Sequence, residues 1–276
     1  MARPSRGSWK QARVALLLAA LAVAAAWAAG LTRTRAARRE WSRPLEVAVI
    51  LLSPLPREAP ALVRFAEGLP DLERLLGAER ERHLGPGPAP FAFRLRGPIQ
   101  WEDPPPLHPE SDGLLGRLVH AVEAWQYLRR VQRSAGISLD AEDLVVVAWI
   151  ESPAEGAATA FAEGAGALGG ETGMVRAAAS GEDASLALTA LAHELFHNLG
   201  ATDKYDDAGH ALVPSGLAEP ARVPSFPQRF AEIMVGEVPL APRRGRLPSS
   251  LEELRVGPAT AREIGWIPAA DGRPPG

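Results

Sequence analysis

The chain has no cysteine among its 276 residues. This absence excludes disulfide bonds and every metal site built on thiolate ligands, although it does not identify the redox compartment. Lysine is nearly absent as well, because only Lys10 and Lys204 occur and arginine supplies the other basic residues. Alanine is abundant, and we interpret both biases as the coding preference of a GC-rich genome, without functional content.

A basic surface is also missing from most of the chain. Residues 1–43 carry nine of the 30 Lys and Arg residues and one of the 33 Asp and Glu residues, so residues 44–276 have a net charge of −11. Phosphate binding needs a basic surface, and we therefore expect no nucleic-acid partner. The basic flanks at the N-terminus suit anionic lipid headgroups instead.

An uncharged run extends from Val14 to Leu31, which is long enough for a marginal membrane span. It lies between a basic segment, residues 1–13, and a basic linker, residues 32–43, an arrangement typical of a signal peptide or an uncleaved signal anchor. We expect an N-terminal transmembrane anchor with the following domain outside the cytoplasm. Cleavage near Ala26-Trp27-Ala28, followed by secretion, is the first alternative, and a soluble amphipathic helix is the second.

Apolar periodicity predicts an α+β domain over residues 44–268. Buried or half-buried strands are expected at Leu45–Leu52, Phe91–Leu95 and Leu144–Ile150. Helical spacing of apolar residues is found in residues 61–84 and 111–134. Helix signals continue near the C-terminus, with a capping box at residues 250–253 and a short helix from Pro258 to Gly265, so we expect a helical C-terminal subdomain. Residues 269–276 are predicted to be a disordered tail.

The most informative segment begins at His193 and reads HELFHNLGATD. On a helix, His193 and His197 project from one face about one turn apart, close enough to bind a single metal ion. Glu194 lies between them and can accept a proton from a metal-activated water. Gly200 can end the helix in the left-handed conformation and turn the chain back, which makes Asp203 the expected third ligand. Three protein ligands and one open position are typical of a catalytic zinc site, with one Zn²⁺ per chain.

Other residues compete for the third ligand position. The rival side chains in the same region are Asp206, Asp207 and His210, and a different group of zinc hydrolases would use a Glu on a later helix, such as Glu252 or Glu253. We prefer Asp203 because, among these residues, only it lies at the distance from His197 at which a turn at Gly200 would bring the chain back to the helix. Tyr205 is nearby, and nothing in its spacing defines its direction, so we expect a solvent-facing turn residue.

At these residues the sequence resembles the metzincin clan of zinc peptidases, whose motif is HExxHxxGxxH or HExxHxxGxxD. The Asp form is similar to snapalysin-type enzymes. The clan has a methionine-containing turn beneath the zinc, and Met234, in the segment FAEIMVG, lies 31 positions after Asp203. The resemblance covers roughly Leu144–Trp266. It implies a zincin domain with a mixed twisted sheet and a zinc-binding active-site helix, and we expect it to be monomeric.

The resemblance also implies a place for substrate. In metzincins, the strand that borders the cleft and pairs with extended substrate comes just before the zinc helix, and here Gly169, Gly170 and Gly173 occupy that place. Three features depart from the clan. Asp is a harder ligand that could loosen zinc selectivity, no tyrosine follows Met234, and the lack of cysteine rules out latency through a zinc-bound thiolate.

The sequence therefore predicts a zinc-dependent endopeptidase, membrane-anchored or secreted, that acts on peptide or protein substrates. The alternative is a membrane-anchored zinc-containing module, or pseudo-enzyme, that binds peptides without cleaving them. Glu194 argues against the alternative, because a purely structural metal site has no need of a base at that position.

Overall fold

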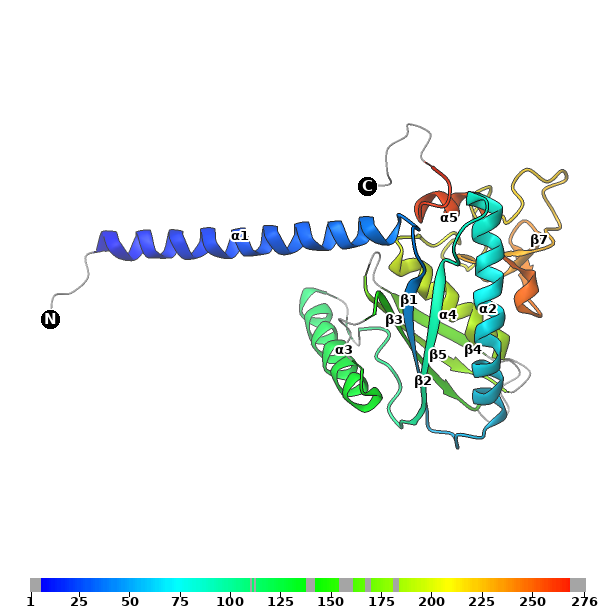
Figure 1. Cartoon of the computed structure of the whole chain (residues 1–276), viewed down its shortest axis with the longest axis horizontal. Coiled ribbons are helices and arrows are strands. Elements are labelled where there is room, and N and C mark those ends of the chain that lie inside the picture. The colour runs from blue at the N-terminus through cyan, green and yellow to red at the C-terminus, as the bar shows by residue number, and fades with distance from the viewer. Residues whose placement is uncertain are drawn as a thin grey trace. The chain divides into compact units, whose positions relative to one another are not determined.

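The computed structural model describes residues 6–109, 111, 113–137, 142–153, 161–166, 170–180 and 184–268. In it the chain forms two compact units, residues 1–40 and residues 41–276 (Figure 1). The predicted disordered tail, residues 269–276, lies outside the described residues.

The first unit is dominated by one helix, α1 (Arg6–Arg38). Nowhere in the described part of the chain is a helix both long and apolar enough to cross a membrane. The predicted transmembrane anchor at residues 14–31, and the membrane-anchored localisation that depended on it, are therefore wrong. The physical reason is composition, since alanine fills much of the run and is far less apolar than the leucine of a typical span. The expected linker, residues 32–43, is itself helical as far as Arg38.

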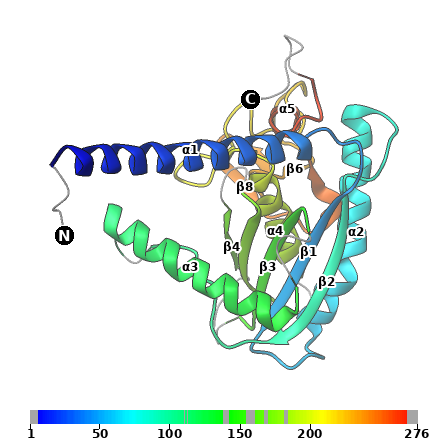
Figure 2. The same ribbon diagram turned by 60° about the vertical axis from the view of Figure 1, so that its left-hand side comes forward.

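The second unit is built on a five-stranded mixed sheet, which confirms the predicted α+β class (Figure 2). Its strands are β1 (Leu45–Ser53), β2 (Phe91–Gln100), β3 (Leu144–Glu151), β4 (Phe161–Gly166) and β5 (Thr172–Ala178). The spatial order is β2-β1-β3-β5-β4. The first four strands in this order run parallel, and β4 pairs antiparallel to β5 at one edge. Among the described residues, strand β4 therefore has no partner on its outer edge.

Helices cover both faces of the sheet, and this explains why β1 and β3 are apolar on both sides. Alternate residues of β1 face opposite cores. One core contains Val49 and the helices α2 (Pro60–Leu84) and α4 (Ala184–Asn198). The other contains Ile50 and helix α3 (Leu114–Ala135).

The chain after α4 is mostly loops and short strand pairs. Strand β6 (Ala231–Glu232) pairs with β9 (Leu254–Arg255), and β7 (Val238–Ala241) pairs with β8 (Arg244–Arg246). The helical elements are η2 (Leu251–Glu253) and α5 (Pro258–Glu263). The predicted helical C-terminal subdomain is therefore wrong, because its helix signals produce only one turn of 3₁₀-helix and one short α-helix.

An aromatic cluster joins this C-terminal part to the core. The ring of Trp266 contacts those of Trp41 and Phe196, with ring centroids 5.5 and 5.7 Å away. The indole nitrogen of Trp41 also donates a hydrogen bond to the carbonyl of Ile264, at 2.9 Å. Because Phe196 belongs to α4, the cluster holds α5 beside the C-terminal end of that helix.

Candidate metal centre

Helix α4 carries the predicted motif through the middle of the domain. Most of its residues are buried, and it lies on the sheet face that it shares with α2. The helix ends at Asn198, and Gly200 adopts a φ of +95°, a left-handed conformation that favours glycine. The amide of Ala201 then donates back to the carbonyl of Phe196, at 3.0 Å. This reversal brings Asp203 to the helix, as the sequence predicted.

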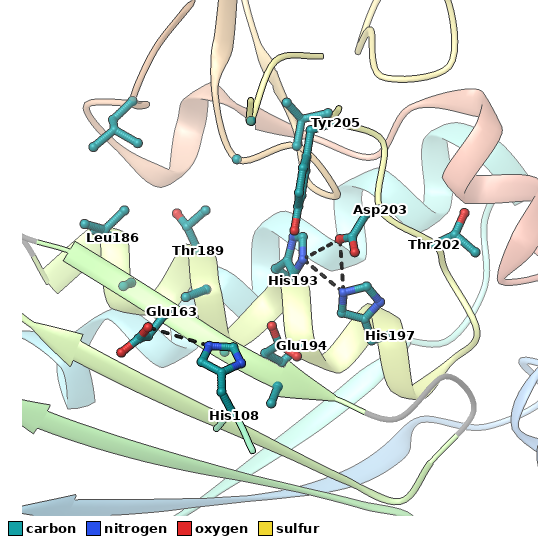
Figure 3. A pocket seen from close by; sticks show the side chains of 18 residues that line it. His108, Glu163, Leu186, Thr189, His193, Glu194, His197, Thr202, Asp203 and Tyr205 are labelled. Atoms are coloured by element: carbon teal, nitrogen blue, oxygen red, sulfur yellow. Dashed lines mark hydrogen bonds and ion pairs between the residues drawn. The ribbon is translucent and has the colours of Figure 1, made fainter. Parts of the chain in front are cut away.

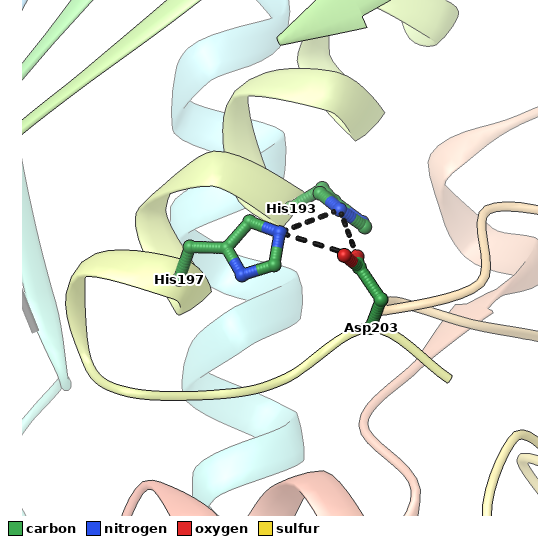
Figure 4. A group of neighbouring side chains, drawn as sticks. All are labelled: His193, His197 and Asp203. Atoms are coloured by element: carbon green, nitrogen blue, oxygen red, sulfur yellow. Dashed lines mark hydrogen bonds and ion pairs between the residues drawn. The ribbon is translucent and has the colours of Figure 1, made fainter. Parts of the chain in front are cut away.

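Three donor atoms meet at one point. The Nε2 atoms of His193 and His197 are 3.1 Å apart, and the Oδ1 atom of Asp203 lies 3.2 Å from each (Figure 4). Four donors arranged tetrahedrally at zinc–ligand distances of about 2.0–2.1 Å are separated by about 3.3–3.4 Å, so this triangle fits a zinc ion closely. In the described part of the chain, this is the group whose ligand atoms come close enough to share a metal.

The protonation of the two imidazoles supports the same conclusion. The Nδ1 atom of His193 lies 3.0 Å from the carbonyl oxygen of Ile233, and that of His197 lies 2.9 Å from the carbonyl oxygen of Ala201. A carbonyl oxygen only accepts, so both Nδ1 atoms carry a proton, and in the neutral imidazoles both Nε2 lone pairs face Asp203. Two lone pairs and a carboxylate directed at one point could hold a metal ion between them.

The carbonyl that orients His193 belongs to the predicted Met-turn. Met234 is fully buried in the core that also contains α4. The amides of Val235 and Gly236 both donate to the carbonyl of Glu232, at 2.9 Å, which closes the turn. The carbonyl of Met234 in turn accepts from the amide of Lys204, at 3.1 Å. The turn therefore contacts both the ligand helix and the loop that carries Asp203.

Glu194 lies next to the ligands and outside the ligand triangle. It is 5% exposed, and its Oε2 atom is buried without a hydrogen-bond partner. Burial raises the pKa of this carboxyl to about 7, with His193 opposing the shift and the charge of Asp203 adding to it. A carboxylate held in this way is suited to accept a proton.

Two glycines make room for that carboxylate. A Cβ atom at Gly164 on β4 would lie 2.5 Å from both Cγ and Cδ of Glu194, and closer still to Oε1. A Cβ atom at Gly173 on β5 would lie 3.2 Å from the Cβ of Glu194. The side chain of Glu194 therefore rests directly on the sheet.

A cavity of about 750 Å³ opens in front of His193, His197 and Asp203 (Figure 3). Its wall includes residues 162–165 of β4 and, from α4, Leu186, Thr189 and Ala190. Val235 and Gly236 come from the predicted Met-turn, Leu247 follows β8, and His108 comes from the loop after β2. No motif in the sequence indicated such a role for His108. Its side chain is exposed and faces Glu163 across 3.9 Å.

The strand bordering this cavity is not the one implied by the sequence. Gly173 lies in β5, which has β3 on one side and β4 on the other and so has no free edge. Gly170 precedes β5, and Gly169 lies outside the described residues. The free edge and the cavity wall belong to β4, a strand that the Gly- and Ala-rich composition concealed.

The alternative candidates for the third ligand lie outside the group formed by His193, His197 and Asp203. Asp206 accepts hydrogen bonds from the amides of Ala208 and His210 within its own loop, both at 3.0 Å. Glu253 binds Arg246 and the amide of Ser249. The remaining candidates, Asp207, His210 and Glu252, are not part of the metal-ligand group that the described residues form.

Tyr205 does not simply face solvent. Its ring stacks on that of His193, with centroids 6.3 Å apart (Figure 3). Its hydroxyl is hydrogen-bonded to Asp203. Burial, followed by the charge of Asp203, raises the pKa of Tyr205 to about 12. The phenol is therefore protonated at neutral pH, and its one proton is donated to the carboxylate of Asp203 beside the cavity that Tyr205 lines.

Comparison of the chain with protein-family models and with curated proteins finds no match. The functional assignment accordingly depends on the geometry of this site.

Proposed function

We propose that the chain is a zinc-dependent endopeptidase of the metzincin type, with His193, His197 and Asp203 as zinc ligands. The observation that carries this proposal is the combination of a zinc-sized triangle of donors with a buried, unpaired carboxylate beside it. A structural zinc site has four protein ligands and no open position, whereas here three ligands open onto a cavity.

When bound, zinc would lower the pKa of a coordinated water and polarise the scissile carbonyl. Glu194 takes the proton of the attacking water and then delivers it to the leaving amine, as a general base followed by a general acid.

Tyr205 provides a second group for the reaction. Its hydroxyl has one proton, which Asp203 accepts in the free site, and turning this proton toward the substrate would donate a hydrogen bond to the carbonyl oxygen as negative charge develops on it. The tyrosine that some metzincins carry after the Met-turn is missing here, and Tyr205 reaches the site from the ligand loop instead.

The free edge of β4 suits an extended peptide substrate. Residues 162–165 of β4 line the cavity, and an added strand could pair with the backbone groups on the outer edge of β4. Main-chain pairing of this kind is independent of side chains, so it fits cleavage within a polypeptide better than recognition of one small molecule.

The test compares the full chain with its Glu194→Gln variant on a mixed peptide library, with and without a chelator. We expect the wild type to cleave peptides only when it contains zinc. Glu194→Gln should keep one zinc per chain and lose hydrolysis, because the amide preserves the shape of the carboxylate but cannot accept the proton. Cleavage by the zinc-loaded variant would contradict the role of Glu194. Peptide binding without cleavage by the wild type would instead support the binding-module alternative.

A further inference from the structure

The three proposed ligands are not held equally well. His193 and His197 are fixed by the rigid helix α4 and by backbone carbonyls that bind their Nδ1 atoms. Asp203 belongs to a loop outside regular secondary structure, and its side chain is 44% exposed. A ligand in that position needs support from its neighbours in the chain.

Both neighbours of Asp203 bind the same carboxylate, that of Glu263 at the end of α5. The amide of Thr202 donates to Oε2 of Glu263 and its hydroxyl donates to Oε1, both at 3.0 Å. The ammonium group of Lys204 donates to Oε2, at 2.7 Å. One side chain, about 60 positions away in the sequence, therefore restrains the residues on either side of the ligand.

Lys204 is buried, with only 4% of its surface exposed. Its three ammonium protons have three acceptors, because the group also donates to the carbonyl and the hydroxyl oxygen of Thr202, each at 2.7 Å. A buried ammonium group needs a counterion, and Glu263 is the carboxylate that contacts it. The backbone amide of Lys204 also binds the carbonyl of Met234, so this residue joins α5 to the Met-turn.

Glu263 is itself firmly placed. Ala261 and Ile264, on either side of it, are fully buried. The carbonyl of Ile264 accepts the indole hydrogen bond of Trp41, and the amide of Trp266 donates to the carbonyl of Ala261, at 2.7 Å. The carboxylate thus projects from a rigid part of the aromatic cluster toward the ligand loop.

We propose that Glu263 is a positioning residue of the metal centre, which holds Asp203 at its ligand position through Thr202 and Lys204. The proposal rests on the proposed function only in requiring that the site binds a metal. It assigns the C-terminal helix a role in metal binding, although this helix contributes no ligand.

The experiment measures zinc affinity of the full chain by competition with a chromogenic chelator, for the wild type, Glu263→Ala and Glu263→Gln. We expect Glu263→Ala to weaken zinc binding by about 10–100-fold, the usual effect of removing a group that supports a metal ligand. Glu263→Gln should weaken it less, since the amide can still bind Thr202 but leaves the charge of Lys204 without a counterion. The matched control is Glu46→Gln, which removes one surface carboxylate of nearly the same exposure, paired with Arg94.

A second readout separates positioning from general stability. In the cobalt-substituted protein, the visible absorption bands report ligand geometry, and we expect them to change in both Glu263 variants and to stay unchanged in Glu46→Gln. Circular dichroism of the metal-free proteins checks that the variants fold, and Glu263→Gln carries the test if Glu263→Ala does not fold.

Wild-type zinc affinity and an unchanged cobalt spectrum in the folded Glu263 variants would overturn the proposal. This test of Glu263 does not depend on whether the protein hydrolyses peptides. If the wild type cleaves no peptide but Glu263→Ala still weakens zinc binding, the peptidase assignment fails and the role of Glu263 stands. If Asp203→Ala loses zinc and Glu263→Ala does not, the role of Glu263 fails alone.

Discussion

Replacing Gly164 by alanine should inactivate the protein without removing its metal. The added Cβ atom would lie 2.5 Å from Cγ and Cδ of Glu194, whereas ordinary contacts of a Cβ atom begin at 3.4 Å. Because β4 is hydrogen-bonded to β5 along its length, the carboxylate rather than the strand must move. A displacement of about 1 Å in a catalytic group costs on the order of 100-fold in rate, and we expect a loss of at least that size in kcat/KM.

The assay compares kcat/KM on a cleaved peptide with zinc content, for Gly164→Ala and for Gly77→Ala as control. Gly77 lies in α2, and a Cβ atom there meets nothing within 4 Å, so alanine should leave activity unchanged and favour the helix slightly. Both variants should keep one zinc per chain, since neither substitution touches a ligand. Wild-type kcat/KM in zinc-loaded Gly164→Ala would refute the reasoning, because it would show that Glu194 does not need its observed position.

Two further predictions concern the ligand loop. The first is measured as the zinc content that remains after dialysis against a weak chelator. Asp203→Ala should lower this content sharply, Asp203→His should largely restore it, and Asp207→Ala should have no effect. Undiminished zinc in Asp203→Ala would place the third ligand elsewhere. Tyr205→Phe should lower kcat by about 100-fold, the usual cost of losing one oxyanion donor, while zinc content stays the same. An unchanged kcat would show that the Tyr205 hydroxyl takes no part in the reaction.

Local patterns predicted the parts of the site that depend on local geometry. The spacing of His193 and His197 defines their relative positions as soon as the segment is helical, and the glycine turn at Gly200 determines where the chain can go next. The buried strands β1 and β3 were equally predictable, because a strand covered on both faces has to be apolar throughout.

Composition is a poor guide where a residue is small because a side chain from a distant segment packs against it. Strand β4 contains two glycines, and a Gly- and Ala-rich stretch looks like a loop, yet Gly164 is small because Glu194 lies against it. At the N-terminus the uncharged run was long enough for a membrane span, but its alanines make it too weakly apolar. Near the C-terminus, the capping box at residues 250–253 and the helix ends at Pro258 and Gly265 correspond to one 3₁₀ turn and one short helix, which do not form a helical subdomain.

The sequence by itself determined the donor atoms of the candidate metal site, the carboxylate beside them and the turn that returns Asp203, since all of these lie within eleven consecutive residues. Only the tertiary structure decided what surrounds them. The edge strand that forms the cavity wall, the direction of Tyr205 and the contact of Glu263 with Thr202 and Lys204 join segments distant in the chain. Such contacts arise from packing around a common core, and no spacing within a single segment can encode them.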